Sequence, residues 1–251
     1  RFVQGVARPG LWVIRPPAPN GLAVLVIPGG GYEGLALDRE GLDLARLFAS
    51  AGATAYVLEH RLPGEGWTEG HAAPLADAGQ ALALIRAERT TPPQRIAVCG
   101  ISAGGHLALL LAHAQAPAAL AGLMLAYPLV TLQGPWAFAR SRTTLLGPDP
   151  DPQLVSRMSP LDLPWASAPP TLILQAIDDP IAPVGGALGL AARLSGAPVS
   201  HLRLLSRGGH GFIGRDPGLA ADWTSALMRF LTLIPAPRRE GRQVSDRLRS
   251  R

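Results

Sequence analysis

The stretch that decides the fold is Val98-Cys-Gly-Ile-Ser-Ala-Gly-Gly-His-Leu-Ala108, which contains the pattern G-x-S-x-G around Ser102. A short apolar run at 95–99 is typical of a strand, and the Ala/Leu-rich run after Ser102 is typical of a helix. A sharp turn between strand and helix is the setting that exposes a serine hydroxyl above a sheet. The pentapeptide alone fits a plain Gly/Ser turn equally well, so the rest of the chain decides between the two.

The sequence around this stretch predicts an α/β fold with a mostly parallel, doubly wound sheet flanked by helices. Apolar runs of strand length occur at 11–15, 22–27, 54–58, 95–99, 120–126, 171–177 and 199–205. Between and after them, apolar residues at helical spacing occur at 38–51, 72–89, 103–112, 184–194 and 220–233. We expect 1–234 to form one domain, with 128–165 as an irregular pocket or lid segment. In such a sheet, sites form at the carboxyl ends of the strands.

Composition excludes several classes of partner. All 23 basic residues are arginine, and six of them lie in 235–251, which leaves 17 arginines against 16 acidic residues in 1–234. A nearly neutral body argues against a nucleic-acid groove, and we expect 235–251 to be a basic, disordered tail. No apolar run reaches the roughly 20 residues that span a bilayer, so no membrane segment is predicted. The single cysteine, Cys99, excludes an internal disulfide.

A serine hydroxyl needs a base to accept its proton and an acid to orient that base. Of six histidines, His210 has the best position, since it follows the last predicted strand within Gly208-Gly-His-Gly-Phe212. Two others lie on the helix after Ser102, one lies inside a strand, and two lie in a loop that could line the pocket: His106, His113, His201, His60 and His71. The sequence therefore predicts His210 as the base.

Two adjacent carboxylates, Asp178 and Asp179, follow the predicted strand 171–177 and satisfy the chain order of serine, acid and histidine. Spacing alone does not separate them. Three other aspartates in the irregular segment are interpreted as solvated turn residues: Asp149, Asp151 and Asp162. For the developing oxyanion, the Gly29-Gly30-Gly31 run offers backbone N–H groups, and the N–H of Ala103 follows the serine. No G-K-[ST] follows those glycines, which weakens a phosphate-binding interpretation.

These stretches resemble the α/β-hydrolase superfamily over about residues 10–233. Within it they are most similar to small bacterial carboxylesterases related to carbohydrate acetyl esterases, the acetylxylan-esterase-like group. The similarity is carried by Ile27-Pro-Gly-Gly-Gly-Tyr32, Arg39-Glu-Gly-Leu42, Arg61-Leu-Pro63, Leu75-Ala-Asp77, Gly100-Ile-Ser-Ala-Gly-Gly-His-Leu-Ala108, Leu145-Leu-Gly147, Ser159-Pro160, Asp178-Asp-Pro-Ile-Ala-Pro183 and Gly208-Gly-His-Gly-Phe212.

The resemblance implies Ser102 as nucleophile, His210 as base and N–H groups of Gly30, Gly31 and Ala103 as the oxyanion hole. It favours Asp179 over Asp178, because the family pattern Asp-x-x-Val-Pro falls on residues 179–183. Two positions depart from the family: Pro28 replaces a histidine that opens the loop in many lipolytic esterases, and Ala182 replaces the usual valine.

The predicted function is that of a serine carboxylesterase without metal or cofactor, which removes short acyl groups, acetyl above all, from sugars or xylo-oligosaccharides. We expect no large cap, and four aromatic residues are candidates for lining the site: Tyr32, Trp67, Trp136 and Trp165. The partner is a small-molecule or oligosaccharide ester, with no nucleic acid and no membrane. The alternatives are an arylformamidase or peptidase on the same scaffold, or a non-catalytic binding protein. A secreted or periplasmic location is expected in preference to a cytoplasmic one.

Overall fold

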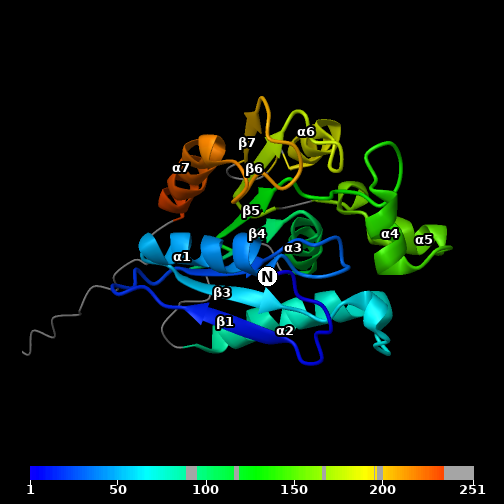
Figure 1. The fold of residues 1–251 in the computed structure, drawn as a ribbon, viewed down its shortest axis with the longest axis horizontal. Helices are drawn as coiled ribbons and strands as arrows, with labels where there is room; N and C mark the ends of the chain where they lie inside the picture. The colour runs from blue at the N-terminus through cyan, green and yellow to red at the C-terminus, as the bar shows by residue number, and fades with distance from the viewer. Residues whose placement is uncertain (89–94, 116–118, 166–167, 195, 197–199, 235–251) are drawn as a thin grey trace, which may run out of the picture.

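A seven-stranded sheet organises the chain. The computed structural model describes residues 1–88, 95–115, 119–165, 168–194, 196 and 200–234. The strands are β1 (Gly10–Ile14), β2 (Ala23–Ile27), β3 (Thr54–Glu59), β4 (Ile96–Ile101), β5 (Gly122–Ala126), β6 (Thr171–Ala176) and β7 (Ser200–Leu205). Their order across the sheet is β1-β3-β2-β4-β5-β6-β7, and only β1 runs antiparallel to its neighbour (Figure 1). The predicted, mostly parallel sheet is therefore confirmed.

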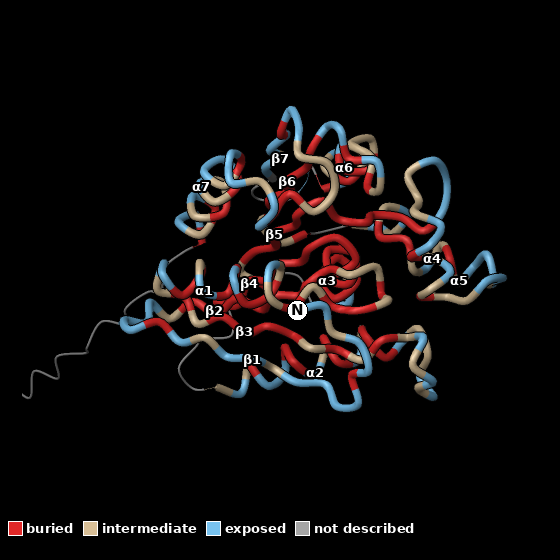
Figure 2. Tube along the Cα trace, in the orientation of Figure 1, coloured by how far each residue is buried: buried red, intermediate tan, exposed pale blue. Residues whose placement is uncertain are grey.

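Helices cover both faces of this sheet. One apolar cluster joins α1 (Asp43–Ser50) and α7 (Pro217–Leu233) to side chains from one face of the sheet, such as Val24 and Val26. A second cluster joins α2 (Ala73–Ala87), α3 (Ala103–Ala114) and α6 (Val184–Arg193) to the opposite face. Every residue of β2, β4, β5 and β6 is buried, as Figure 2 shows at the centre of the molecule. Burial on both faces explains why these strands are uninterrupted apolar runs.

Segment 128–165 is more regular than expected. It contains α4 (Ala139–Leu146), α5 (Pro152–Arg157) and the short 3₁₀ turn η5 (Pro160–Asp162). Asp151, interpreted from the sequence as a solvated turn residue, is the N-cap of α5, since its carboxylate accepts a hydrogen bond from the N–H of Gln153 at 2.9 Å. Helices of six and eight residues are too short to establish a periodic apolar pattern, which is why the sequence did not predict them.

The other differences lie at element boundaries. The helix expected at 38–51 begins as a π-helical turn, η1 (Leu37–Leu42), and continues as α1. Two short 3₁₀ turns, η2 (Pro63–Glu65) and η3 (Gly70–Ala72), lie in the loop after β3. The closing helix begins at Pro217, three residues earlier than expected, because Asp216 caps it by accepting from the N–H of Gly218.

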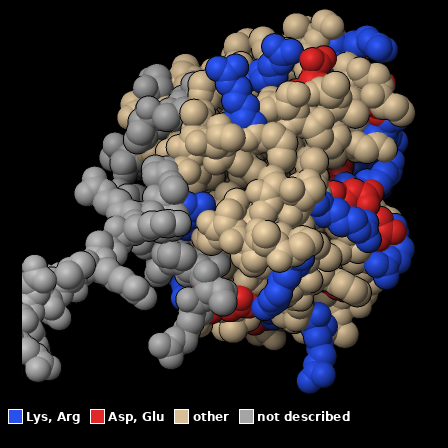
Figure 3. Space-filling view, turned by 90° about the vertical axis from the view of Figure 1, so that its left-hand side faces the viewer, with Lys and Arg blue, Asp and Glu red and all other residues tan. Residues whose placement is uncertain are grey.

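Surface charge shows no single patch on the face drawn in Figure 3, where basic and acidic side chains are dispersed among other residues. In the part of the chain that is described, no helix is long and apolar enough to cross a membrane. The predicted tail, 235–251, lies outside the described residues. The expected absence of a nucleic-acid partner and the expected export stay predictions.

Candidate active site

Ser102 occupies a strained turn between the last residue of β4 and the first residue of α3. Its backbone has φ 53° and ψ −119°, a conformation that L-residues rarely adopt and that the surrounding structure must enforce. A Cβ on Gly104 would lie 2.1 Å from the carbonyl oxygen of Ile27, and one on Gly100 would lie 2.5 Å from Cβ of Ala108. The two glycines of G-x-S-x-G are thus required by the close approach of β2 and α3 to the turn.

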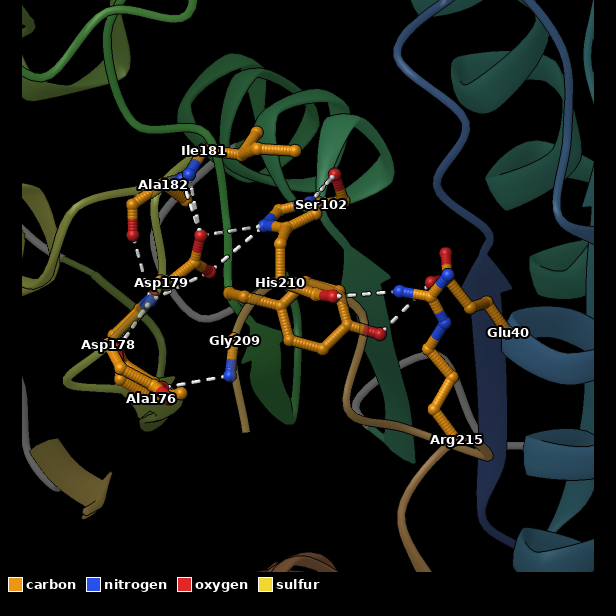
Figure 4. Close-up of polar contacts among 12 residues, drawn as sticks. Glu40, Ser102, Ala176, Asp178, Asp179, Ile181, Ala182, Gly209, His210 and Arg215 are labelled. Atoms are coloured by element: carbon orange, nitrogen blue, oxygen red, sulfur yellow. Dashed lines mark hydrogen bonds and ion pairs between the residues drawn. The ribbon is translucent and has the colours of Figure 1, made fainter. Parts of the chain in front are cut away.

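A continuous chain of hydrogen bonds joins the three residues predicted as nucleophile, base and acid (Figure 4). Ser102 Oγ lies 2.7 Å from His210 Nε2. His210 Nδ1 lies 2.9 Å from Oδ2 of Asp179 and 3.1 Å from Oδ1. The residues follow β4, β7 and β6, whose carboxyl ends meet at one edge of the sheet because the strands are parallel. This arrangement can deprotonate the serine and stabilise the resulting imidazolium.

Asp179, not Asp178, is the carboxylate that contacts His210. The Asp179 side chain is fully buried, and Oδ1 accepts hydrogen bonds from the N–H groups of Ile181 and Ala182, each at 2.8 Å. Its Oδ2 accepts from Nε2 of Gln175 at 3.1 Å. These donors hold the carboxylate in one orientation.

Asp178 faces the other way. Its carboxylate accepts from the N–H groups of Gly209 at 2.8 Å and Gly208 at 3.2 Å, and these bonds, the Gly209 bond first, hold the pKa of Asp178 below its usual range. Asp178 therefore fastens the loop that carries His210, and the two carboxylates that spacing could not separate have different tasks.

The glycine loop after β2 packs directly against Ser102. A Cβ on Gly29 would lie 2.8 Å from Cβ of Ser102, and one on Gly30 would lie 2.0 Å from the carbonyl oxygen of Gly34, where Gly30 has φ 138°. Gly30 and Gly31 both line the hollow above Ser102. Ala103 is the first residue of α3, so its N–H has no acceptor within the helix. The three residues predicted to form the oxyanion hole flank the nucleophile, and their donation to an oxyanion stays a prediction.

The hollow at Ser102 has a volume of about 290 Å³. Its lining comes from the glycine loop, η1, α4 and the loops after β6 and β7, and from Phe2: Gly30, Gly31, Ala36, Arg39, Glu40, Ser102, Phe138, Ser141, Ile181, His210, Gly211 and Arg215. Segment 128–165 contributes Phe138 and Ser141, so it supplies one wall of the hollow. Phe2 and Arg215 were not expected from the sequence, and Arg39, although it lies in a stretch that carries the family resemblance, was given no role there.

None of the four aromatic candidates lines this hollow, and their contact with a substrate stays a prediction. Tyr32 is buried, and its hydroxyl contacts His106. The ring of Trp67 lies under the guanidinium of Arg61, and Nε1 of Trp165 donates to the carbonyl of Pro160. Trp136 packs so closely on α6 that a Cβ on Gly185 would lie 2.5 Å from its Nε1. Large rings fill gaps between elements, and their sequence positions do not reveal that packing.

Three other histidines, His106, His60 and His71, make contacts away from the hollow at Ser102. His106 Nδ1 lies 2.7 Å from the hydroxyl of Tyr32, and Nε2 lies 2.7 Å from the carbonyl oxygen of Met158. Burial lowers the pKa of His106 to about 4, although the bond to Met158 opposes that shift. His60 is buried with Nδ1 2.8 Å from the carbonyl oxygen of Arg61, and burial lowers its pKa. His71 lines a separate hollow between η3 and α4. His60 and His71 do not line the hollow at Ser102.

Glu40 and Tyr127 support the site from behind, and sequence reasoning did not assign them a role. The Tyr127 ring meets the His210 ring edge-on, with centroids 4.9 Å apart. Its hydroxyl donates to Oε1 of Glu40 at 3.0 Å, and Oε2 accepts from the N–H of Gly29 at 2.9 Å. Burial raises the pKa of Glu40, and the hydrogen bond from Tyr127 partly opposes this. One carboxyl thus connects the glycine loop to the ring that packs on His210. The sequence did contain one indication that Tyr127 belongs to the site, because this residue directly follows β5 and sites form at the carboxyl ends of the strands.

Residues 64–233 match the family model described as the prolyl oligopeptidase family, Peptidase_S9. The chain belongs to this family. It is 26% identical over 240 residues to an acetylxylan esterase of Xylanibacter ruminicola. The aligned region covers 92% of this chain and 49% of that protein. It is 28% identical over 218 residues to an endo-1,4-β-xylanase B of Butyrivibrio fibrisolvens, covering 80% of this chain and 34% of that protein. The chain therefore spans about half or less of the length of these relatives.

Solved structures also match about nine-tenths of the chain. An acetyl ester-xyloside bifunctional hydrolase from Caldicellulosiruptor lactoaceticus gives a TM-score of 0.78 at 29% identity, with 90% of this chain and 88% of that chain covered. A thermophilic esterase from Thermogutta terrifontis with propionate bound gives 0.71 at 26%, with 89% of both chains covered. These matches confirm the predicted α/β-hydrolase fold and the resemblance to the acetylxylan-esterase-like group.

Proposed function

We propose that this protein is a serine carboxylesterase that hydrolyses short-chain esters, above all acetyl esters of sugars or xylo-oligosaccharides. The observation that carries the proposal is the unbroken chain from Ser102 Oγ through His210 to the buried carboxylate of Asp179, beside a glycine loop and open to a hollow. The sugar-ester part is supported by the names of the relatives, an acetylxylan esterase and an acetyl ester-xyloside hydrolase.

In the first half-reaction, Ser102 Oγ attacks the ester carbonyl carbon while its proton passes to His210 Nε2. Asp179 accepts the hydrogen bond from Nδ1 and stabilises the imidazolium. The negative charge on the carbonyl oxygen would be bound by the N–H groups of Gly30, Gly31 and Ala103, and each such donor typically contributes about 3 kcal/mol.

The tetrahedral intermediate then collapses, and the bond to the alcohol oxygen breaks as His210 returns the proton to that oxygen. Water enters, gives a proton to His210 and attacks the acyl-serine, and the free acid leaves as Ser102 regains its proton. Phe138 and Ile181 give the hollow an apolar side that fits a short acyl group.

The test is a panel of p-nitrophenyl esters of increasing acyl length together with acetylated xylose. Acetyl esters are expected to give the highest kcat/KM, and Ser102→Ala is expected to abolish turnover. Ser225→Ala serves as the matched control, because Ser225 lies on α7 and does not line the hollow.

The family name makes a peptidase the rival, and arylformamidase chemistry needs the same groups. A prolyl peptide p-nitroanilide and N-formylkynurenine therefore belong in the panel. Turnover of either compound with none of any acetyl ester would overturn the proposal. A Ser102→Ala protein that keeps full function would indicate a non-catalytic binding protein.

A further inference from the structure

Two arginines line the hollow on the side of His210. Arg39 comes from η1 and Arg215 from the loop after β7, and both side chains are exposed. Glu40 is the only acidic residue among the lining residues, and its carboxyl is occupied by Tyr127 and Gly29. The outer part of the hollow is therefore cationic.

Both side chains lie against the loop that carries His210. Nη1 of Arg215 donates to the carbonyl oxygen of His210 at 3.3 Å, and its side chain runs over Gly211, where a Cβ would lie 3.6 Å from Nη1. The stem of Arg39 packs on Gly214, where a Cβ would lie 3.4 Å from Cβ of Arg39. The Arg215 guanidinium is thus hydrogen-bonded beside the base, and the stem of Arg39 lies against the same loop.

Within the described part of the chain, neither guanidinium forms an ion pair. Arginines elsewhere do have carboxylate partners, as Arg61 has Asp77 and Arg203 has Asp222. The charge of Arg39 lowers the pKa of Glu40, an effect smaller than that of burial, but the two side chains are not in direct contact as an ion pair. The N–H donors of Arg39, and those of Arg215 that do not bond the His210 carbonyl, remain available to an anion, for which guanidinium geometry is suited.

The position of the arginines identifies which part of the ester would carry the anion. His210 returns its proton to the leaving alcohol oxygen, so the alcohol part of the ester lies on the His210 side. Figure 4 shows Arg215 and Ile181 on opposite sides of the His210 ring. The apolar side, with Ile181 and Phe138, then belongs to the acyl group, and the arginines face the alcohol.

We propose that the preferred substrates are acetyl esters whose alcohol part bears a carboxylate, such as acetylated sugars that contain a uronic acid. The carboxylate is bound by Arg39 and Arg215 while His210 protonates the leaving oxygen. This proposal rests on the esterase function proposed above.

The experiment compares two substrates that differ only in charge, the peracetylated methyl glycosides of glucuronic acid and of glucuronamide, with p-nitrophenyl acetate as a neutral reference. The wild-type protein is expected to show a kcat/KM about tenfold higher for the acid than for the amide, and the ratio should fall as salt is added, because rim charges are screened. Arg39→Gln and Arg215→Gln should each lower the acid-to-amide ratio about threefold, and the double variant should bring it close to one.

Arg193→Gln is the matched control, since Arg193 is exposed at the end of α6 and does not line the hollow; its ratio should equal that of the wild type. Equal kcat/KM for acid and amide in a wild-type protein that hydrolyses p-nitrophenyl acetate would overturn this inference and leave the esterase function standing. No turnover of any acetyl ester would overturn both. A clear preference for the matched 6-phosphate over the uronate would replace carboxylate by phosphate as the anion.

Discussion

Two histidines contact Ser102, His210 through its ring and His106 through its backbone N–H, and each has a partner at both ring nitrogens. His210 contacts the Ser102 hydroxyl and the Asp179 carboxylate, and its side chain is 16% exposed. His106 contacts the Tyr32 hydroxyl and the Met158 carbonyl, and it is 0% exposed. A carbonyl can only accept, so Nε2 of His106 carries the hydrogen and Nδ1 accepts from Tyr32.

The difference shows that the charge of the partner decides what a bonded histidine can do. A buried carboxylate stabilises an imidazolium, so His210 can hold the proton of Ser102 during the reaction. Neutral partners and full burial leave a charge on His106 uncompensated, so that ring stays neutral and joins α3 to the glycine loop and to the end of α5. One network is built for proton transfer and the other for stability.

The largest expected effect is the loss of activity when His210, and not His106, is removed. His210→Ala should lower kcat for p-nitrophenyl acetate by about 10⁴- to 10⁶-fold, because the serine loses its base. His106→Ala should keep kcat within about tenfold of the wild type. Steady-state kinetics of the two variants decide the matter, and an equal loss in a folded His106→Ala protein would contradict the assignment.

The next largest effect distinguishes the two carboxylates near His210, Asp179 and Asp178, by their influence on kcat. Asp179→Asn should lower kcat by about 10³- to 10⁴-fold, since an amide no longer selects the correct tautomer or stabilises the imidazolium. Asp178→Asn should cost less than about tenfold, because its carboxylate bonds backbone N–H groups of the loop and does not bond the His210 ring. The same ester assay measures both variants, and a reversed order would assign the acid to Asp178.

The two histidines should rank in the opposite order for stability, because removal of His106 should lower the free energy of unfolding more than removal of His210. His106→Ala leaves the Tyr32 hydroxyl and the Met158 carbonyl buried without partners, and should lower the free energy of unfolding by about 2–4 kcal/mol. His210→Ala, at a partly exposed position, should cost about 1 kcal/mol or less. Urea denaturation curves give both values. Similar losses in the two variants would mean that the His106 network does not stabilise the fold.

The smallest effect is a dependence on pH. The folded pKa of His106 is about 4, below the ordinary 6.5 that it would have when unfolded. Between these values the unfolded chain binds the proton and the folded protein does not, so stability falls as the pH falls from about 6.5 to about 4. Because the two states differ by at most one bound proton at this residue, the free energy of unfolding changes by at most about 1.4 kcal/mol per pH unit. Urea denaturation at several pH values gives the free energy of unfolding of the wild type and of His106→Gln as a function of pH. Over this window the free energy should fall more steeply with falling pH in the wild type than in the variant. Parallel plots of free energy against pH would contradict the prediction.

Much of the fold was visible in local patterns. The uninterrupted apolar runs predicted the central strands because burial on both faces removes polar residues from such strands. The short helices α4 and α5 were missed, since few turns carry little periodicity and one of them depends on the Asp151 cap. In the site, Ser102 and His210 were predictable because each stands in a distinctive glycine-rich motif next to a strand end.

The sequence by itself determined the alternation of strands and helices, the strained turn at Ser102 and the position of His210 after the last strand. Each of these follows from the order of neighbouring residues along the chain. Only the tertiary structure decided which aspartate meets His210, which aromatic rings pack between elements, and which arginines reach the hollow. Those outcomes depend on the direction in which a side chain points and on which neighbouring element it contacts. Residues distant in sequence determine both. The G-x-S-x-G stretch gave the nucleophile, and folding supplied its partners.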